Sequence, residues 1–329
     1  MRHSRAAVPS APEHRPVACR GRAPTAIVLT TCALLGAGPV GSEAQARDTL
    51  VVGTYAYDAV DRRGAVTPLA EYLGARLKRP SRVVLAADPV ALADAARRRE
   101  VDVVVTNTFG YLLLADAAPR AGLAVATFRV PPGVRTHYSA VLVTRDARLR
   151  GWAELRARAP HLRVGLVSPG STTGNLVPRL VLARHGWEER DQQVPSVTYA
   201  GTHAGAFGLL RTGAVDVAGL ATEEYQRQIA ALDAAERARY HVLWESPDIL
   251  LGPVAVHTGL PAALRDTIRA ALVGLERHAP AAFAALRGGW TEARRADGLV
   301  AATDATYLPV RRLFGEGAAL AALIGRLAR

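Results

Sequence analysis

The sequence predicts an α/β fold of two lobes, each a mostly parallel sheet flanked by helices, with two strands crossing between the lobes. Strand-like apolar runs alternate with helix-like segments along the chain, and the alternation starts again after Trp152. The 329 residues are long enough for more than one domain. The expected boundaries are 47–138 plus 253–329 for the first lobe and 139–252 for the second.

Each expected element follows from its hydrophobic pattern: short Val- and Leu-rich runs indicate buried strands, and apolar residues three or four apart indicate helices. First-lobe strands are expected at 49–54, 81–86, 101–106 and 124–129, with helices at 66–77, 89–99 and 111–118. Second-lobe strands are expected at 138–144, 162–167, 196–200, 215–220 and 242–244, with helices at 175–185, 204–212 and 223–239. A strand at 253–257, a helix at 264–278 and a helical tail from Phe283 complete the chain.

Two segments, 139–145 and 252–259, are the expected crossover strands because they bracket the second β-α block. Parallel sheets bind their ligands at the carboxyl ends of the strands. Small and polar residues gather in the loops that follow those ends, so we expect a ligand cleft between the lobes.

The first 46 residues have the pattern of a secretory signal peptide. Arginines precede a short apolar run at 26–35, and Ala44-Gln45-Ala46 fits a cleavage site, with cutting expected after Ala46. Both cysteines, Cys19 and Cys32, lie in this segment, so the mature chain has neither a disulfide nor a cysteine nucleophile. We expect a periplasmic or otherwise extracytoplasmic protein.

The formal net charge of +12 comes almost entirely from arginine, since Lys78 is the only lysine among 41 basic residues. These residues are scattered without a nucleic-acid-binding motif, so no nucleic-acid partner is expected. The nine histidines are also dispersed, and no metal or other cofactor is expected. A positive surface would help to attract an anionic ligand.

One loop, Ser168-Pro-Gly-Ser-Thr-Thr-Gly174, joins an expected strand to an expected helix. Its residues Ser171, Thr172 and Thr173 place three hydroxyls where a helix presents unpaired N–H groups, which attract anions. Gly174 would let a ligand approach the backbone closely. The loop therefore predicts an oxyanion cradle, and the alternative is an ordinary Ser/Thr helix cap.

The mature chain resembles, over essentially its whole length, the substrate-binding proteins of phosphate, phosphite and phosphonate ABC importers, which have the type II periplasmic-binding-protein fold. The segments that carry the resemblance are short, but their order and spacing together are specific. They are Ser171-Thr-Thr-Gly174 with Leu176-Val-Pro178, Tyr199-Ala-Gly-Thr-His203, Val215-Asp-Val-Ala218, Leu243-Trp-Glu-Ser-Pro247 before Gly252-Pro253, Gly289-Trp290 and Tyr307-Leu-Pro-Val-Arg311.

The resemblance implies that the hydroxyls of Ser171, Thr172 and Thr173 hold a phosphorus oxyanion, and that His203 completes the grip. It also implies that Glu223 meets the amine of an aminoalkyl ligand. The alternatives are that His203 caps its helix or is structural, and that Glu223 is a surface carboxylate in a first helical turn.

The chain departs from the phosphonate-binding pattern at three positions. A second acidic residue is replaced by Gly252, and two aromatic residues are replaced by Thr106 and Pro89. A smaller oxyanion such as phosphite, methylphosphonate or phosphate is therefore expected to suit the remaining hydroxyls. The first-lobe wall is expected to come from Tyr55 first of all, with Asn107, Thr108, His137 and Tyr138 as the other candidates.

The resemblance implies a non-enzymatic binding protein, expected to be monomeric, that closes its lobes on a small oxyanion. It would then deliver the anion to a membrane permease and its ATPase. One alternative is a ligand-sensing subunit for a receptor kinase. The other is a serine-type phosphoester hydrolase with Ser171 as nucleophile and His203 as base, although no nucleophile-elbow motif accompanies them.

Overall fold

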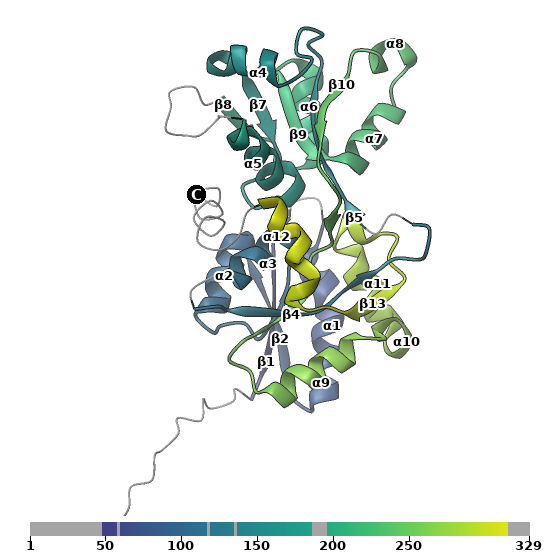
Figure 1. Ribbon diagram of the computed structural model, residues 1–329. Coiled ribbons are helices and arrows are strands. Elements are labelled where there is room, and N and C mark those ends of the chain that lie inside the picture. Colours follow the sequence, from purple (N-terminus) through teal and green to yellow (C-terminus); the bar gives the residue numbers. More distant parts are fainter. Residues whose placement is uncertain (1–47, 58–59, 117–118, 135–136, 186–195, 315–329) are drawn as a thin grey trace, which may run out of the picture. The chain divides into compact units, whose positions relative to one another are not determined.

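The computed structural model describes residues 48–57, 60–116, 119–134, 137–185 and 196–314 (Figure 1). The expected signal peptide, with its cleavage site after Ala46, lies outside the described residues.

The strands form two large sheets and one short ribbon. The six-stranded sheet has the order β13-β4-β12-β3-β1-β2, the five-stranded sheet has the order β10-β6-β9-β7-β8, and β11 pairs with β5. The strands are β1 (Leu50–Tyr55), β2 (Ser81–Ala86), β3 (Val103–Val105), β4 (Gly122–Arg129), β5 (His137–Tyr138), β6 (Ala140–Thr144), β7 (Arg163–Leu166), β8 (Ser196–Tyr199), β9 (Val217–Ala221), β10 (His241–Glu245), β11 (Ile249–Leu250), β12 (Val254–His257) and β13 (Gly298–Ala301).

Helices connect most of these strands. The α-helices are α1 (Arg62–Leu77), α2 (Pro89–Arg97), α3 (Thr108–Ala115), α4 (Trp152–Arg158), α5 (Val177–Arg184), α6 (His203–Thr212), α7 (Thr222–Ala230), α8 (Ala234–Arg237), α9 (Ala262–Leu272), α10 (Leu275–His278), α11 (Pro280–Gly288) and α12 (Leu308–Phe314). The shorter helical turns are η1 (Ala159–His161), the π-helical η2 (Thr172–Leu176), η3 (Thr291–Ala293) and η4 (Asp304–Tyr307).

Both large sheets are mixed, which corrects the expectation of mostly parallel sheets. Parallel pairing is confined to β2-β1-β3 and β8-β7-β9, the strands joined by helical crossovers. β6 and β12, which follow the short strands β5 and β11 in the chain, run antiparallel to both of their neighbours. The expected class, two α/β sheets flanked by helices, is confirmed.

The two crossing strands are β5 and β11, which pair antiparallel with Ile249 opposite Tyr138. They directly precede the segments 139–145 and 252–259 that were expected to cross, and those segments instead form β6 and β12 inside the two large sheets. The strands before this crossing and after it contribute to the six-stranded sheet, and those between contribute to the five-stranded sheet.

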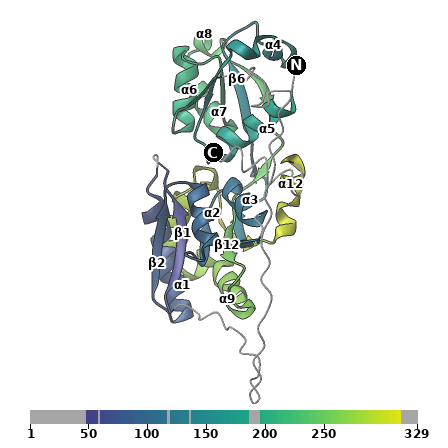
Figure 2. The same cartoon turned by 90° about the vertical axis from the view of Figure 1, so that its left-hand side faces the viewer.

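Helices cover both faces of the six-stranded sheet (Figures 1 and 2). Leu50 and Val52 of β1 pack in a cluster with α1 and α9, whereas Val51 packs in a second cluster with α2 and α3. The second cluster also contains Leu176 and Val177. The helix that follows the loop 168–174, called the hydroxyl loop below, therefore starts in the same core as α3. This packing fixes the position of the loop.

Three departures from the expected helices occur in the second half of the chain. The helix expected at 264–278 breaks at Gly274, whose φ of 89° is left-handed and separates α9 from α10. The helix expected at 223–239 divides into α7 and α8. The tail contains β13 as well as helices, and this edge strand pairs with β4.

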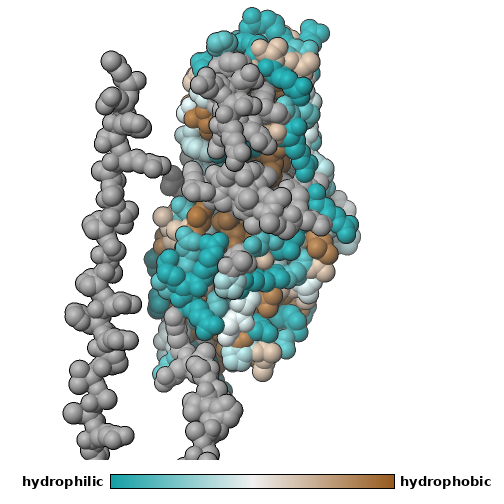
Figure 3. Space-filling view, turned by 60° about the vertical axis from the view of Figure 1, so that its left-hand side comes forward, coloured by the Kyte–Doolittle hydropathy of each residue, from teal (hydrophilic) through white to brown (hydrophobic). Residues whose placement is uncertain are grey.

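The surface view shows polar residues over most of the coloured face, with hydrophobic residues in separate areas (Figure 3). Large apolar side chains that are exposed within the described residues are Val197, Tyr199, Val242 and Leu308. No helix in the described part of the chain has both the length and the hydropathy needed to cross a membrane.

Candidate functional site

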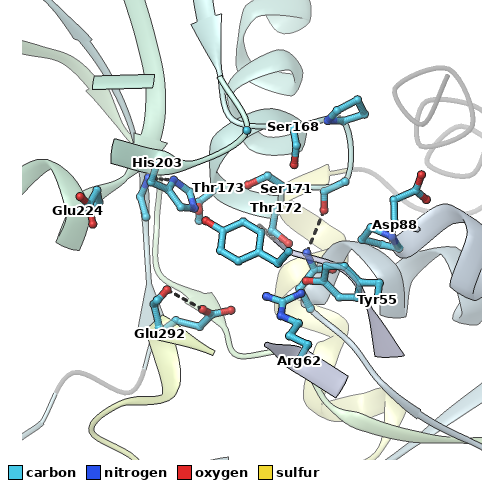
Figure 4. Close-up of a pocket in the computed structure, with 18 of the residues that line it drawn as sticks. Tyr55, Arg62, Asp88, Ser168, Ser171, Thr172, Thr173, His203, Glu224 and Glu292 are labelled. Atoms are coloured by element: carbon cyan, nitrogen blue, oxygen red, sulfur yellow. Dashed lines mark hydrogen bonds between the residues drawn. The ribbon is translucent and has the colours of Figure 1, made fainter. Parts of the chain in front are cut away.

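A pocket of about 230 Å³ is lined by residues from both large sheets. Its walls are the loop after β1, the starts of α1, α2 and α6, the loop 168–173, the first turns of α7, and η3. Figure 4 shows the hydroxyl residues and His203 on one side of the pocket, with Tyr55, Arg62 and Glu292 on the other. Seven of the nine predicted site residues line it: Tyr55, Asn107, Ser171, Thr172, Thr173, His203 and Glu223.

The hydroxyl loop is both a helix cap and a pocket wall. Ser171 is the N-cap of η2, and its Oγ accepts the Gly174 N–H at 3.0 Å. That contact uses an acceptor lone pair and leaves the Ser171 O–H able to donate into the pocket. Ser171 is therefore a helix cap, as the alternative interpretation expected. Its hydroxyl can still donate to a ligand.

The loop is tied to the start of α3 by two hydrogen bonds. The Phe109 N–H donates to Thr172 Oγ1 at 3.0 Å, and Asn107 Nδ2 donates to the Gly170 carbonyl at 2.9 Å. Asn107 is also the N-cap of α3 and accepts the Gly110 N–H at 2.8 Å. Thr172 and Asn107 therefore connect the hydroxyl loop to the start of α3 through hydrogen bonds.

Two predicted site residues, Gly174 and Thr108, do not line the pocket. A Cβ on Gly174 would lie 2.2 Å from Cγ2 of Val167, the residue that follows β7, so close packing requires glycine at this position. The Thr108 hydroxyl donates to the Leu250 carbonyl at 2.6 Å, which ties α3 to β11.

His203 begins α6 and lines the pocket. The helix cap is Thr202, whose side chain accepts the Gly205 N–H, so His203 is not the capping residue. The Ala221 N–H donates to His203 Nδ1 at 3.0 Å. Burial, together with the Arg227 charge, lowers the pKa of His203 to about 4. The neutral ring therefore carries its proton on Nε2, which can donate to an anion.

Arg62, with three aromatic side chains around it, is a pocket residue that the sequence did not predict. Its Cζ lies 4.1 Å from the ring centre of Tyr55, 4.8 Å from that of Trp290 and 4.9 Å from that of Tyr57. Burial raises the pKa of Tyr55 to about 12, although the Arg62 charge acts in the opposite direction. Nothing local to Arg62 distinguishes it from the other arginines, so the sequence offered no signal.

Carboxylates also line the pocket. Glu223 stands in the first turn of α7 as predicted, whereas the neighbouring Glu224 is buried and pairs with Arg227. Glu292 of η3 lines the same pocket and was not predicted. Neither Glu223 nor Glu292 forms an ion pair with another described residue.

The missing acidic residue at Gly252 has a steric explanation. A Cβ at this position would lie 2.2 Å from the carbonyl oxygen of Thr106 and 2.5 Å from Asn107 Cα. The chain therefore cannot carry a carboxylate there without moving the start of α3. Glu292, from a segment far along the sequence, supplies a carboxylate to the pocket instead.

The pocket's chemistry is that of hydrogen-bond donors with nearby carboxylates. No group of three or more His, Cys, Asp or Glu side chains suited to a metal ion occurs within the described ranges. The donors that line it include the Ser171 and Thr173 hydroxyls, His203 Nε2 and the Arg62 guanidinium, and such groups stabilise an oxyanion.

Two mixed α/β sheets flanked by helices, with two crossing strands and a pocket lined from both sheets, define the type II periplasmic-binding-protein class. The profile of one family, described as "ABC transporter, phosphonate, periplasmic substrate-binding protein", matches residues 54–307. The chain belongs to this family of extracytoplasmic substrate-binding proteins.

Solved structures with the same fold include one from Xanthomonas citri bound to chloride, with a TM-score of 0.66 and 20% identity over 85% of this chain and 99% of that one. A binding protein component of an ABC phosphonate transporter from Pseudomonas aeruginosa has a TM-score of 0.57 and 19% identity, over 85% and 94% of the two chains. PhnD1 from Prochlorococcus marinus in complex with methylphosphonate has a TM-score of 0.55 and 14% identity, over 81% and 97%. A comparison with curated proteins found no match in sequence.

Proposed function

We propose that the pocket binds a phosphorus oxyanion, that is, a phosphonate, phosphite or phosphate, and that the protein delivers it to an ABC permease and its ATPase. The observation that carries the proposal is the convergence of the Ser171 and Thr173 side chains with a neutral His203 ring on one wall of the pocket. Hydrogen bonds to a charged acceptor contribute about 1.5–3 kcal/mol each. Several of them together can exceed the entropic cost of binding the ligand.

The size of the pocket favours a small ligand. At about 230 Å³ it lies below the range of roughly 300–1,000 Å³ that is usual for drug-sized ligands. The pocket also reaches Glu223 and Glu292, two carboxylates without ion-pair partners among the described residues. A phosphonate whose organic substituent carries a positive charge would use both the hydroxyl wall and these carboxylates, whereas bare phosphate would use only the first.

The hydrolase alternative has little support in the geometry. A serine nucleophile needs a base that accepts its proton, but His203 Nδ1 already accepts the Ala221 N–H. The other ring nitrogen of the neutral ring then carries a proton and cannot act as that base. A kinase-coupled sensor would use the same pocket, so the ligand test below applies to it as well.

The test is a thermal-shift titration of the mature chain from Arg47 with phosphate, phosphite, methylphosphonate, aminoethylphosphonate and sulfate. A ligand that binds only the native state at 100 times its Kd stabilises the protein by about 2.7 kcal/mol, which raises the melting midpoint. We expect a shift with at least one phosphorus oxyanion, and we expect Ser171→Ala or His203→Ala to remove it.

Thr267→Ala is a matched control, because the exposed Thr267 hydroxyl donates only to the Ala263 carbonyl of its own helix α9. This variant should keep the full ligand-induced shift. The absence of a shift with every phosphorus oxyanion, or an unchanged shift in both pocket variants, would contradict the proposal.

A further inference from the structure

Arg62 is a buried cation held in the wall of the pocket. Asp61 caps α1 through the Gly64 N–H, and Arg62 is the first residue of that helix. The residue is only 6% exposed, yet it is among those lining the pocket. Its Nε donates to the Gly289 carbonyl at 3.1 Å, which fixes the guanidinium between two segments distant in sequence.

The surroundings of Arg62 satisfy its charge incompletely. The rings of Tyr55, Tyr57 and Trp290 offer cation–π contacts, which stabilise a desolvated cation. No carboxylate among the described residues forms a salt bridge with Arg62, and its Nη1 is buried without a hydrogen-bond partner there. A buried charge without a counter-charge is unfavourable, so an anion in the pocket would relieve that cost.

Tyrosines line the pocket together with Arg62 and the hydroxyl loop. Tyr55 lies beside Arg62, whose Cζ is 4.1 Å from the ring centre of Tyr55, and Tyr138 lines the same pocket. Thr172 of the hydroxyl loop lines this pocket as well. Figure 4 shows Arg62 beside Tyr55 and across the pocket from His203. The guanidinium and the hydroxyl loop therefore face a shared space.

We infer that Arg62 is a ligand-binding residue that selects the anion by charge, so the site prefers a tetrahedral oxyanion with two negative charges to one of the same shape with a single charge. This inference rests on the proposed function. The hydroxyls and the neutral His203 donate to any oxyanion, whereas the attraction of a fixed positive charge grows with the charge of the anion. Two arginines line the pocket: Arg227 is paired with Glu224, and Arg62 has no ion-pair partner among the described residues.

The test compares methylphosphonate with methanesulfonate at mildly alkaline pH, by calorimetric titration. Each anion has a methyl group and three oxygens around a tetrahedral centre, and the fully ionised phosphonate carries one more negative charge. We expect the wild-type protein to bind methylphosphonate at least tenfold more tightly. Arg62→Gln should reduce this preference at least tenfold, whereas Ser171→Ala should weaken both anions by similar factors.

Arg63→Gln is the matched control, because the exposed Arg63 is the next residue of α1 and donates to the Val83 carbonyl. It should keep the wild-type preference. Arg62 also holds the Gly289 carbonyl, so the ligand-free melting midpoint of each variant has to be measured. Should Arg62→Gln fail to fold, Arg62→Lys makes the same test: the charge is kept, so the preference should persist while both affinities fall.

An Arg62→Gln protein that folds and keeps the wild-type preference overturns the inference, as does Arg62→Lys with unchanged affinities for both anions. A wild-type protein that binds no phosphorus oxyanion overturns the proposed function instead. The two failures are therefore distinguishable.

Discussion

The hydroxyl loop (168–174) and the arginine wall (Arg62 with Tyr55, Tyr57 and Trp290) form opposite sides of one pocket, but they are built in different ways. The loop is a continuous stretch of chain between β7 and α5, and its polar groups are neutral hydroxyls and backbone N–H groups. The wall joins Arg62 to Gly289, which is 227 positions away in sequence, and it contains a full positive charge. Local sequence therefore encodes the first, and only the folded chain assembles the second.

The two sides of the pocket are also expected to control different properties of binding: the loop controls the affinity for anions, and the wall controls the selectivity among them. Hydroxyls and a neutral imidazole can serve any oxyanion, because they donate hydrogen bonds without a net charge. A buried guanidinium surrounded by aromatic rings adds a charge whose effect is large in a poorly solvated pocket. We expect perturbations of the loop to change how tightly anions bind, and perturbations of the wall to change which anions bind.

The largest effect is expected in the wall, from Trp290→Ala. Trp290 is 2% exposed and packs in the core cluster with α1 and α11. Removing a buried tryptophan side chain lowers the free energy of unfolding by about 3–5 kcal/mol, and urea denaturation would measure it. A loss below about 1 kcal/mol would show that the wall is not part of the packed core.

The next effect is expected at the base of the loop, from Gly174→Ala. The new Cβ would press on Val167 at the end of β7, and overpacking of this kind destabilises by about 1–3 kcal/mol. Denaturation should show that loss together with weaker oxyanion binding. Gly208→Ala is the control: a Cβ on Gly208 meets nothing within 4 Å, so this helical substitution should stabilise by about 0.4–1 kcal/mol.

His203 should make the free energy of unfolding decrease at acidic pH. Its folded pKa of about 4 lies below its ordinary value of 6.5, so the unfolded chain binds more protons between these values. Stability is then full above pH 6.5 and falls as the pH drops toward 4, by about 1–2 kcal/mol for a ring that faces the pocket. Denaturation of wild type and His203→Gln at several pH values should show a shallower slope in the variant. Equal slopes would mean that His203 is not held neutral.

Asn107 joins the hydroxyl loop to the start of α3, and Asn107→Ala should have the smallest effect of these variants. The substitution removes the cap of α3 and the bond to Gly170, and losing a cap of this type costs about 1 kcal/mol. We expect a small drop in the melting midpoint and weaker binding of every oxyanion, with the preference between them unchanged. A changed preference would place Asn107 with the wall.

The elements that the sequence predicted well share a local cause. β2 matches its expected bounds, and the hydroxyl loop and His203 stand at helix starts as expected, because strand periodicity and capping chemistry act over a few residues. The features that the sequence did not predict depend on how separate segments of the chain pack together. Gly174 packs closely against Val167 after β7, and Gly252 packs closely against Thr106. Glu292, from the C-terminal part of the chain, lines the pocket. No local pattern signals such contacts.

We place one phosphorus oxyanion between the hydroxyl loop and the arginine wall. A crystal structure of the mature chain with methylphosphonate tests it most directly. We predict phosphonate oxygens about 2.7–3.0 Å from Ser171 Oγ, from His203 Nε2 and from a guanidinium nitrogen of Arg62. Phosphonate bound outside the pocket, or bound within it but away from both Ser171 and Arg62, would show that this placement is wrong.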